Sequence, residues 1–174
     1  MKINLKFLLS FAIMFMIIAM FYSALNKEKI YTTENQIGKK ISSFKLESLN
    51  KKKIITESDL LNKKFTLINF WASWCAPCRL EHKYLILLKK NSNLNIIGIN
   101  FKDNKKNANS FLEQLSNPYD FIGKDYNGKV SVLFGVYGIP ESILIDEQLN
   151  IKKKFIGPLN ESDYNIINQF IKLP

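Results

Sequence analysis

The sequence FTLINFWASWCAPCR, residues 65–79, decides the fold of this 174-residue chain. Its first nine residues are a nearly continuous run of β-branched and aromatic side chains, which is typical of a strand covered on both faces. Residues 76–90 follow directly and predict a helix with apolar residues Leu80, Tyr84, Leu85, Leu87 and Leu88. The stretch therefore predicts a buried strand that passes into a helix, with two cysteines at the junction.

The segments on either side of this stretch alternate in the same way. Phe44, Leu46 and Leu49 predict a short strand or hairpin. The other predicted elements are a brief helix over 56–61 capped by Thr56 or Ser58, strands over 95–101, 141–146 and 150–157, helices over 105–116 and 161–172, and a turn or two of helix over 128–134. Alternating strands and helices imply a right-handed parallel crossover, and the later strand pair implies an antiparallel hairpin. We expect an α/β fold with a mixed sheet flanked by helices.

The two cysteines lie where thiol chemistry is favoured. A helix N-terminus carries unpaired N–H groups and a partial positive charge, which lower the pKa of a thiol placed there. Pro77 suits the first helical turn, where its missing N–H removes no bond. We expect Cys75 at an exposed tip and Cys78 one turn deeper and shielded. Cys75 would attack a substrate disulfide, and Cys78 would then resolve the mixed disulfide.

Other interpretations of the pair remain open. It could be an inert structural disulfide, although a bridge that closes so short a loop restrains the unfolded chain only weakly. It could be a metal site completed by Glu81 and His82, or a chance pair of buried thiols. With two cysteines and one histidine in the whole chain, a four-ligand structural zinc site is not expected. On its own, His82 is more typical of the helix surface.

Four segments together resemble a known family. WASWCAPCR, residues 71–79, resembles the active-site segment of the thioredoxin superfamily, and more narrowly that of DsbE/CcmG-type thiol:disulfide interchange proteins of cytochrome c maturation. RLEH at 79–82, GVYGIPES at 135–142 and FIGPL at 155–159 resemble segments of the same family. The resemblance covers roughly residues 37–172 and implies a thioredoxin-like domain.

The resemblance also implies roles for individual residues. Cys75 would be the attacking cysteine and Cys78 the resolving one. Pro140 would follow a cis bond after Ile139 and face the cysteines, although its pattern alone fits an ordinary loop proline. The backbone near Ile139 would pair with an extended substrate peptide.

Trp74, Pro77 and Tyr137 complete the expected substrate-binding residues. Trp74 is expected beside the reactive cysteine and Trp71 in the core, while Tyr137 could line the groove or simply pack. Lys83, Tyr84 and Ser142 depart from the family pattern.

Glu81 and Glu141 stand where the family has acidic residues near the active site. A carboxylate near a thiol disfavours the thiolate and can accept a proton. We therefore expect both glutamates to take part in catalysis and the pKa of Cys75 to be only modestly lowered, as suits a reducing protein. The alternative is that both are solvated surface residues.

Residues 7–25 contain no charged side chain and are long enough to cross a bilayer as a helix. Lys2 and Lys6 precede this run, so the N-terminus is expected to stay cytoplasmic. We expect an uncleaved membrane signal anchor over 1–25, a linker over 26–40 and the thioredoxin-like domain over 41–174. A cleaved signal peptide is the alternative, but the apolar run exceeds a typical h-region and bulky Phe21 or Tyr22 would occupy the −3 position.

The net charge of +10 does not by itself indicate nucleic acid, because nearly all of the positive charge is lysine and Arg79 is the only arginine. The lysine runs 51–53 and 152–154 are more typical of solvated turns and strand edges. We expect no nucleic-acid partner.

The resemblance implies a membrane-anchored oxidoreductase that reduces disulfides in extracytoplasmic proteins. Its substrate would be apocytochrome c or a partner thiol protein of cytochrome c maturation, and its electron donor a membrane thiol reductase. We expect a single-pass protein of the bacterial inner membrane with its catalytic domain in the periplasm. No haem, flavin or metal is expected, only the redox-active disulfide Cys75–Cys78. The alternatives are a reductase for other envelope targets and a non-enzymatic anchored module with an inert disulfide.

Overall fold

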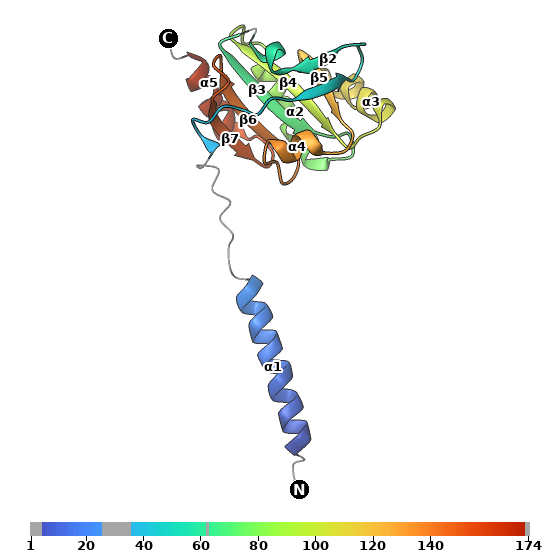
Figure 1. The fold of residues 1–174 in the computed structure, drawn as a ribbon, viewed down its shortest axis with the longest axis vertical. Coiled ribbons are helices and arrows are strands. Elements are labelled where there is room, and N and C mark those ends of the chain that lie inside the picture. The colour runs from blue at the N-terminus through green and yellow to red at the C-terminus, as the bar shows by residue number, and fades with distance from the viewer. Residues whose placement is uncertain (1–4, 26–35, 62, 173–174) are drawn as a thin grey trace. The chain divides into compact units, whose positions relative to one another are not determined.

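The computed structural model describes residues 5–25, 36–61 and 63–172. The chain divides into two units, Met1–Thr32 and Thr33–Pro174, which are described separately (Figure 1). Part of the expected linker, residues 26–35, lies outside the described residues.

The described part of the first unit is helix α1, Leu5–Leu25. Its segment Lys6–Ala24 has a mean hydropathy of 2.2, and none of it is buried against protein. By length and composition this helix can cross a membrane, because about 20 apolar residues match the thickness of the hydrocarbon core.

The second unit is built on a seven-stranded sheet with the order β2-β1-β5-β4-β3-β6-β7 (Figure 1). The strands are β1 (Lys45–Ser48), β2 (Ile54–Thr56), β3 (Phe65–Trp71), β4 (Leu94–Phe101), β5 (Phe121–Asp125), β6 (Glu141–Asp146) and β7 (Ile151–Ile156). The helices are η2 (Glu57–Leu60), α2 (Ala76–Leu88), α3 (Lys105–Leu115), α4 (Lys129–Leu133) and α5 (Glu161–Lys172). β3 runs parallel to β4 and antiparallel to β6, and β6 pairs antiparallel with β7. The expected mixed sheet, with its parallel crossover and later hairpin, is confirmed.

Strand β3 lies at the centre of the core, and all seven of its residues are buried. Its side chains alternate between two apolar clusters. Phe65, Leu67 and Trp71 pack with residues of α2, α3 and α5, on what we call the helix face of the sheet. Ile68 and Phe70 pack with residues of α4 and η2, on what we call the opposite face. A residue's position along β3 therefore decides which face it contributes to.

Strand β5 was not predicted from the sequence. Its sequence FIGKD is short, contains glycine and two charged residues, and has no clear alternation. It is a strand because it lies between β1 and β4 in the sheet. Gly123 is needed there, since a Cβ atom would lie 2.8 Å from Leu46 Cδ1. Tertiary pairing overrides weak local propensity at this strand.

The folded unit includes residues that the prediction assigned to the linker. The Gly38 N–H donates to the Ile151 carbonyl at 2.7 Å, and the Ile151 N–H donates to the Lys39 carbonyl at 2.9 Å. Lys40 forms a bridge with Asn150. The segment 38–40 therefore pairs with the chain at the start of β7, ahead of the boundary expected at residue 41.

Candidate active site

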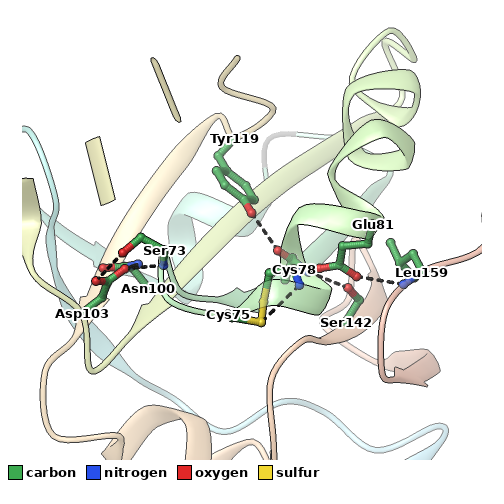
Figure 2. The surroundings of a disulfide bond; sticks show 10 residues. Ser73, Cys75, Cys78, Glu81, Asn100, Asp103, Tyr119, Ser142 and Leu159 are labelled. Carbon is green, nitrogen blue, oxygen red and sulfur yellow. Dashed lines mark hydrogen bonds between the residues drawn. A yellow bond between two sulfur atoms is a disulfide. The ribbon is translucent and has the colours of Figure 1, made fainter. Parts of the chain in front are cut away.

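A disulfide bond joins Cys75 and Cys78 at the start of α2, with an S–S distance of 2.02 Å (Figure 2). Cys75 is the N-cap residue of the helix, and its sulfur accepts a hydrogen bond from the Cys78 N–H at 3.2 Å. Pro77 lies in the first turn, as predicted. Once the bond is reduced, the same N–H and the helix N-terminus favour the thiolate form of Cys75.

The exposure expected for Cys75 is wrong. Cys75 is only 4% exposed and Cys78 2%, and both belong to the core cluster of the helix face. The residues around Cys75 are more open, since Trp74 is 60% exposed and Ala76 is also exposed. The disulfide thus lies just beneath the surface. The Cys75 side chain is buried because it caps α2 and turns toward the Cys78 N–H of its own helix. Trp74 is the exposed group beside it, and Trp71 is in the core, as expected.

Asp103 holds the segment that carries Trp74. Its carboxylate accepts hydrogen bonds from the Ser73 N–H at 2.6 Å and the Ser73 hydroxyl at 2.8 Å, and from Asn100 Nδ2 at 2.9 Å. Trp74 Nε1 donates to the Lys102 carbonyl at 3.3 Å. The prediction missed Asp103. Asp103 comes just after β4, and the carboxyl ends of neighbouring parallel strands meet at one edge of a sheet. Its position in the sequence could therefore have placed it near the end of β3, where the cysteine segment begins.

Glu81 lies one helical turn beyond Cys78 and is completely buried (Figure 2). Its Oε1 accepts a hydrogen bond from Asn69 Nδ2 at 2.8 Å, and its Oε2 accepts one from the Leu159 N–H at 2.9 Å. Burial raises the pKa of Glu81 to about 7, because loss of hydration outweighs these two hydrogen bonds, which favour the charged form. Glu81 is therefore a group that can change its protonation state near neutral pH, and it is not the solvated surface residue of the alternative interpretation.

The network continues from Asn69 across the helix face. Asn69 Nδ2 also donates to Ser142 Oγ at 3.0 Å, and the Tyr119 hydroxyl donates to Asn69 Oδ1 at 2.8 Å. Tyr119 is buried, and its pKa is raised well above the usual range by burial and by the nearby Glu81 charge. The prediction did not single out Asn69, although an amide in the middle of an apolar strand is a signal of a buried polar network.

Gly98 makes room for this network. A Cβ atom at Gly98 would lie 2.8 Å from Trp71 Nε1 and 2.9 Å from Tyr119 Cγ. The rings of Trp71 and Tyr119 stack at a centroid distance of 5.4 Å. The absence of a side chain at Gly98 thus allows the two aromatic rings to lie against β4.

His82 is not a surface residue, contrary to expectation. It is 3% exposed, and its Nε2 lies 2.8 Å from the Ser116 carbonyl oxygen. Burial lowers its pKa. Within residues 5–25, 36–61 and 63–172, no group of three or more His, Cys, Asp or Glu side chains is placed to hold a metal ion.

The structure does not bring Glu141 together with Glu81. Glu141 is 2% exposed, so it too is not a solvated surface residue. It pairs in register with Phe70, whereas Ser142, which contacts the Glu81 network, pairs with Asn69. Because side chains alternate along a strand, Glu141 belongs to the opposite face of the sheet. There its Oε2 lies 2.8 Å from Lys154 Nζ, and both side chains are almost completely buried.

The lysine run 152–154 lies on β7, an edge strand of the sheet, as expected, but Lys154 is buried and not solvated. Lys152 and Lys153 are half-buried, and Lys152 lies 3.8 Å from Asp146, but Lys154 faces inward. The run lies on β7, so alternation along the strand places its members on different faces.

The peptide bond between Ile139 and Pro140 is cis, as the resemblance implied. Glu141 opens β6 beside Phe70, so Pro140 lies at the end of β3 from which the cysteine segment departs. Pro140 is buried, Ile139 is half-buried and packs against the cluster that contains both cysteines, and Tyr137 is 71% exposed. The loop 135–140 and the cysteine segment therefore meet at one end of the sheet.

The arrangement can perform thiol–disulfide exchange. It combines two cysteines in bonding distance, a helix N-terminus that favours a thiolate, and a buried carboxyl with a pKa of about 7 one turn away. A group with a pKa near the working pH is well suited to accept and return a proton.

The Redoxin family matches residues 36–169 of the chain. Among curated proteins, the chain is 53% identical over 95 residues to the thiol:disulfide interchange protein CycY of Rhizobium leguminosarum, a match that spans 55% of this chain and 51% of CycY. It is 41% identical over 124 residues to HelX of Rhodobacter capsulatus, spanning 71% of this chain and 70% of HelX. It is 38% identical over 125 residues to DsbE of Escherichia coli, spanning 71% of this chain and 67% of DsbE.

A solved structure has the same fold as this chain. A Chlorobium tepidum protein, whose crystal structure is described as that of a candidate thiol:disulfide interchange protein DsbE, is 27% identical with a TM-score of 0.67. The match covers 78% of this chain and 94% of that protein. The expected thioredoxin-like fold and the expected enzyme class, a thiol–disulfide oxidoreductase, are confirmed. The chain belongs to the Redoxin family and, within it, to the DsbE-type thiol:disulfide interchange proteins.

Proposed function

We propose that this protein reduces disulfides in extracytoplasmic proteins during cytochrome c biogenesis, while anchored in the membrane by α1. Its substrate is apocytochrome c or a partner thiol protein, as the resemblance implies. The observation that carries the proposal is the Cys75–Cys78 pair at the N-terminus of α2, at the same end of the sheet as the loop that ends in cis-Pro140.

The reaction starts from the reduced pair. The Cys75 thiolate attacks one sulfur of a substrate disulfide, forming a mixed disulfide and releasing the other substrate sulfur as a thiolate. Cys78 then loses its proton and attacks the Cys75 sulfur, which breaks the mixed disulfide and forms the Cys75–Cys78 bond. The substrate leaves with both cysteines reduced, having received two electrons, and its two thiolates take up one proton returned by Glu81 and one from solvent. Glu81 is the proposed acceptor of the Cys78 proton, because its pKa of about 7 permits proton transfer at neutral pH.

The substrate chain is proposed to lie between the cysteine segment and loop 135–140. The backbone at Ile139 would pair with an extended peptide, as in other cases of strand addition. Trp74, Pro77 and Tyr137 would contact its side chains, and Trp74 and Tyr137 are exposed enough to do so.

The oxidised pair must be reduced again after each cycle. A membrane thiol reductase is the proposed electron donor, since an oxidising compartment cannot supply electrons itself. The proposed location is the bacterial inner membrane, crossed once by α1, with the catalytic domain in the periplasm. The disulfide is the only redox group that this reaction requires.

Two alternatives remain. A reductase for other envelope proteins would use the same residues. An anchored module with an inert disulfide is favoured by one observation, which is that Cys75 and Cys78 are 4% and 2% exposed.

A trapping experiment separates an active pair from an inert one. In the Cys78→Ala variant, Cys75 can attack but no second cysteine can release the substrate. We expect a stable mixed disulfide with a synthetic peptide that carries an intramolecular Cys-x-x-Cys-His disulfide, the haem-attachment pattern of c-type cytochromes. The Cys75→Ala variant is the matched control and should form little adduct. If folded Cys78→Ala forms no more adduct than this control, exchange is not the function.

A further inference from the structure

Lys154 is the one lysine among the described residues whose side chain is buried, with 2% of it exposed. Burying an ammonium group is unfavourable unless other groups pair with it, so a buried lysine needs an explanation in its surroundings. On β7 it pairs in register with Ile143, which points it toward the opposite face of the sheet, away from the Glu81 network.

The ammonium group of Lys154 contacts both ends of loop 135–140. It donates a hydrogen bond to the Gly135 carbonyl at 2.5 Å, at the start of the loop. It also lies 2.8 Å from Oε2 of Glu141, the residue that directly follows the loop. Lys154 therefore joins the two points between which the loop runs.

Glu141 connects the same ion pair to the middle of the loop. Its Oε1 accepts hydrogen bonds from the Tyr137 N–H at 3.0 Å and from the Gly138 N–H at 3.2 Å. The ammonium of Lys154 also lies 5.8 Å from the centre of the Tyr137 ring, within reach of a cation–π contact. One buried ion pair thus binds backbone groups of Gly135, Tyr137 and Gly138.

The loop needs such partners because its backbone is not part of the sheet. The N–H groups of Tyr137 and Gly138 and the carbonyl of Gly135 bond to the charged side chains of Glu141 and Lys154 instead of to a neighbouring strand. A buried ion pair adds little net stability compared with apolar residues of similar volume. Here its contacts attach to the backbone on both sides of Ile139 and Pro140.

We infer that Lys154 is a positioning residue for substrate polypeptides: through Gly135 and Glu141 it sets the loop that presents Ile139 and Pro140 to the substrate backbone. The inference rests on the proposed function and deepens it. It predicts that Lys154 matters for disulfides in polypeptides, which need the loop, and not for small disulfides, which need only the cysteines.

The test compares two disulfides with the reduced full chain in detergent micelles. One is the Cys-x-x-Cys-His disulfide peptide and the other is 2-hydroxyethyl disulfide. In Lys154→Met we expect the rate constant with the peptide to fall at least about ten-fold, because small displacements of a binding group have large effects on rate. The rate constant with the small disulfide, and the equilibrium with glutathione, should stay within about two-fold of the wild type.

The matched control is Lys153→Met, which removes a neighbouring half-buried lysine from the same strand. It should leave both rate constants unchanged. Equal rate losses with both disulfides in Lys154→Met would indicate general damage and overturn the inference, as would a wild-type rate with the peptide.

A second variant guards against misfolding of Lys154→Met, which leaves Glu141 buried without a cation. Glu141→Gln combined with Lys154→Met removes both charges, and the amide oxygen can still accept from Tyr137 and Gly138. The Gly135 carbonyl still lacks its donor, so we expect peptide reactivity at least about three-fold below the wild type. Wild-type reactivity of this double variant would overturn the inference.

Amide hydrogen exchange separates this inference from the proposed function. The Tyr137 and Gly138 amides should exchange faster in Lys154→Met than in the wild type or Lys153→Met, whatever the reactivity. If the wild type reacts with neither disulfide while exchange responds as expected, the proposed function fails and the positioning of the loop stands. If exchange at these amides does not change, Lys154 does not position the loop.

Discussion

The replacement of Glu81 by glutamine tests whether a buried carboxyl near the cysteines titrates near neutral pH. Glu81 is completely buried and has a pKa of about 7, compared with 4.5 for an ordinary glutamate. Each pKa unit corresponds to about 1.4 kcal/mol. A shift of this size makes ionised Glu81 unfavourable in the folded protein by about 3 kcal/mol.

The sign of the pH dependence follows from the order in which the two states lose the proton. The unfolded chain releases it near pH 4.5, before the folded chain does near pH 7. The contribution of neutral Glu81 to stability is therefore fully present below about pH 4.5 and is lost as the pH rises to about 7. Glutamine does not titrate, so the free energy of unfolding of Glu81→Gln lacks this decline.

Glutamine also changes the hydrogen bonds, but that effect does not depend on pH. Its amide oxygen can still accept from Asn69, whereas its NH₂ group meets the Leu159 N–H, which loses its acceptor. This mismatch destabilises the variant by about 1–3 kcal/mol at every pH. We therefore expect the variant to be less stable than the wild type at about pH 4 and to gain about 3 kcal/mol relative to it by about pH 8.

Urea unfolding of the oxidised full chain in detergent measures this difference. Both tryptophans of the chain, Trp71 and Trp74, lie in the second unit, so their fluorescence reports on that unit. Glu113→Gln, at an exposed position on α3, is the matched control and should differ little from the wild type at either pH. A stability difference between Glu81→Gln and wild type that is the same at both pH values would refute the raised pKa.

Two further substitutions test the packing around this network. Gly98→Ala should lower the free energy of unfolding, measured by urea titration, by about 1–3 kcal/mol, because its Cβ would overlap Trp71 and Tyr119. The control is Gly138→Ala, whose Cβ position is open space, and it should lower the free energy of unfolding far less. Tyr119→Phe should lower it by about 1–2 kcal/mol, because the buried Asn69 Oδ1 loses its donor. Thermal unfolding measures this, and an unchanged midpoint would mean that another group replaces the hydroxyl.

Much of the fold was predictable because it depends on local pattern. β3 and α2 follow from a continuous apolar strand sequence that ends at a proline-containing helix start. β5 was not predictable, because FIGKD has no strand pattern of its own. It becomes a strand only through pairing with β1 and β4, which are far from it in the sequence.

The reactive pair was also visible in the sequence. Cys75 and Cys78 are three residues apart at a helix start, so their proximity and the favourable N-terminus follow from local geometry alone. How far Cys75 is buried did not follow, because its cover comes from the core cluster around it, to which several elements contribute. Local geometry brings the sulfurs together, and tertiary packing decides their access to solvent.

For the charged residues, the sequence determined only which groups are present. Glu81 and Glu141 are the same residue type near the same end of the sheet, yet one is a buried acid held by Asn69 and Leu159 and the other is the partner of Lys154. Their environments come from residues up to 78 positions away, brought close by strand pairing and alternation. Because the charge state of a buried group depends on the solvent and partners around it, only the tertiary structure could decide it.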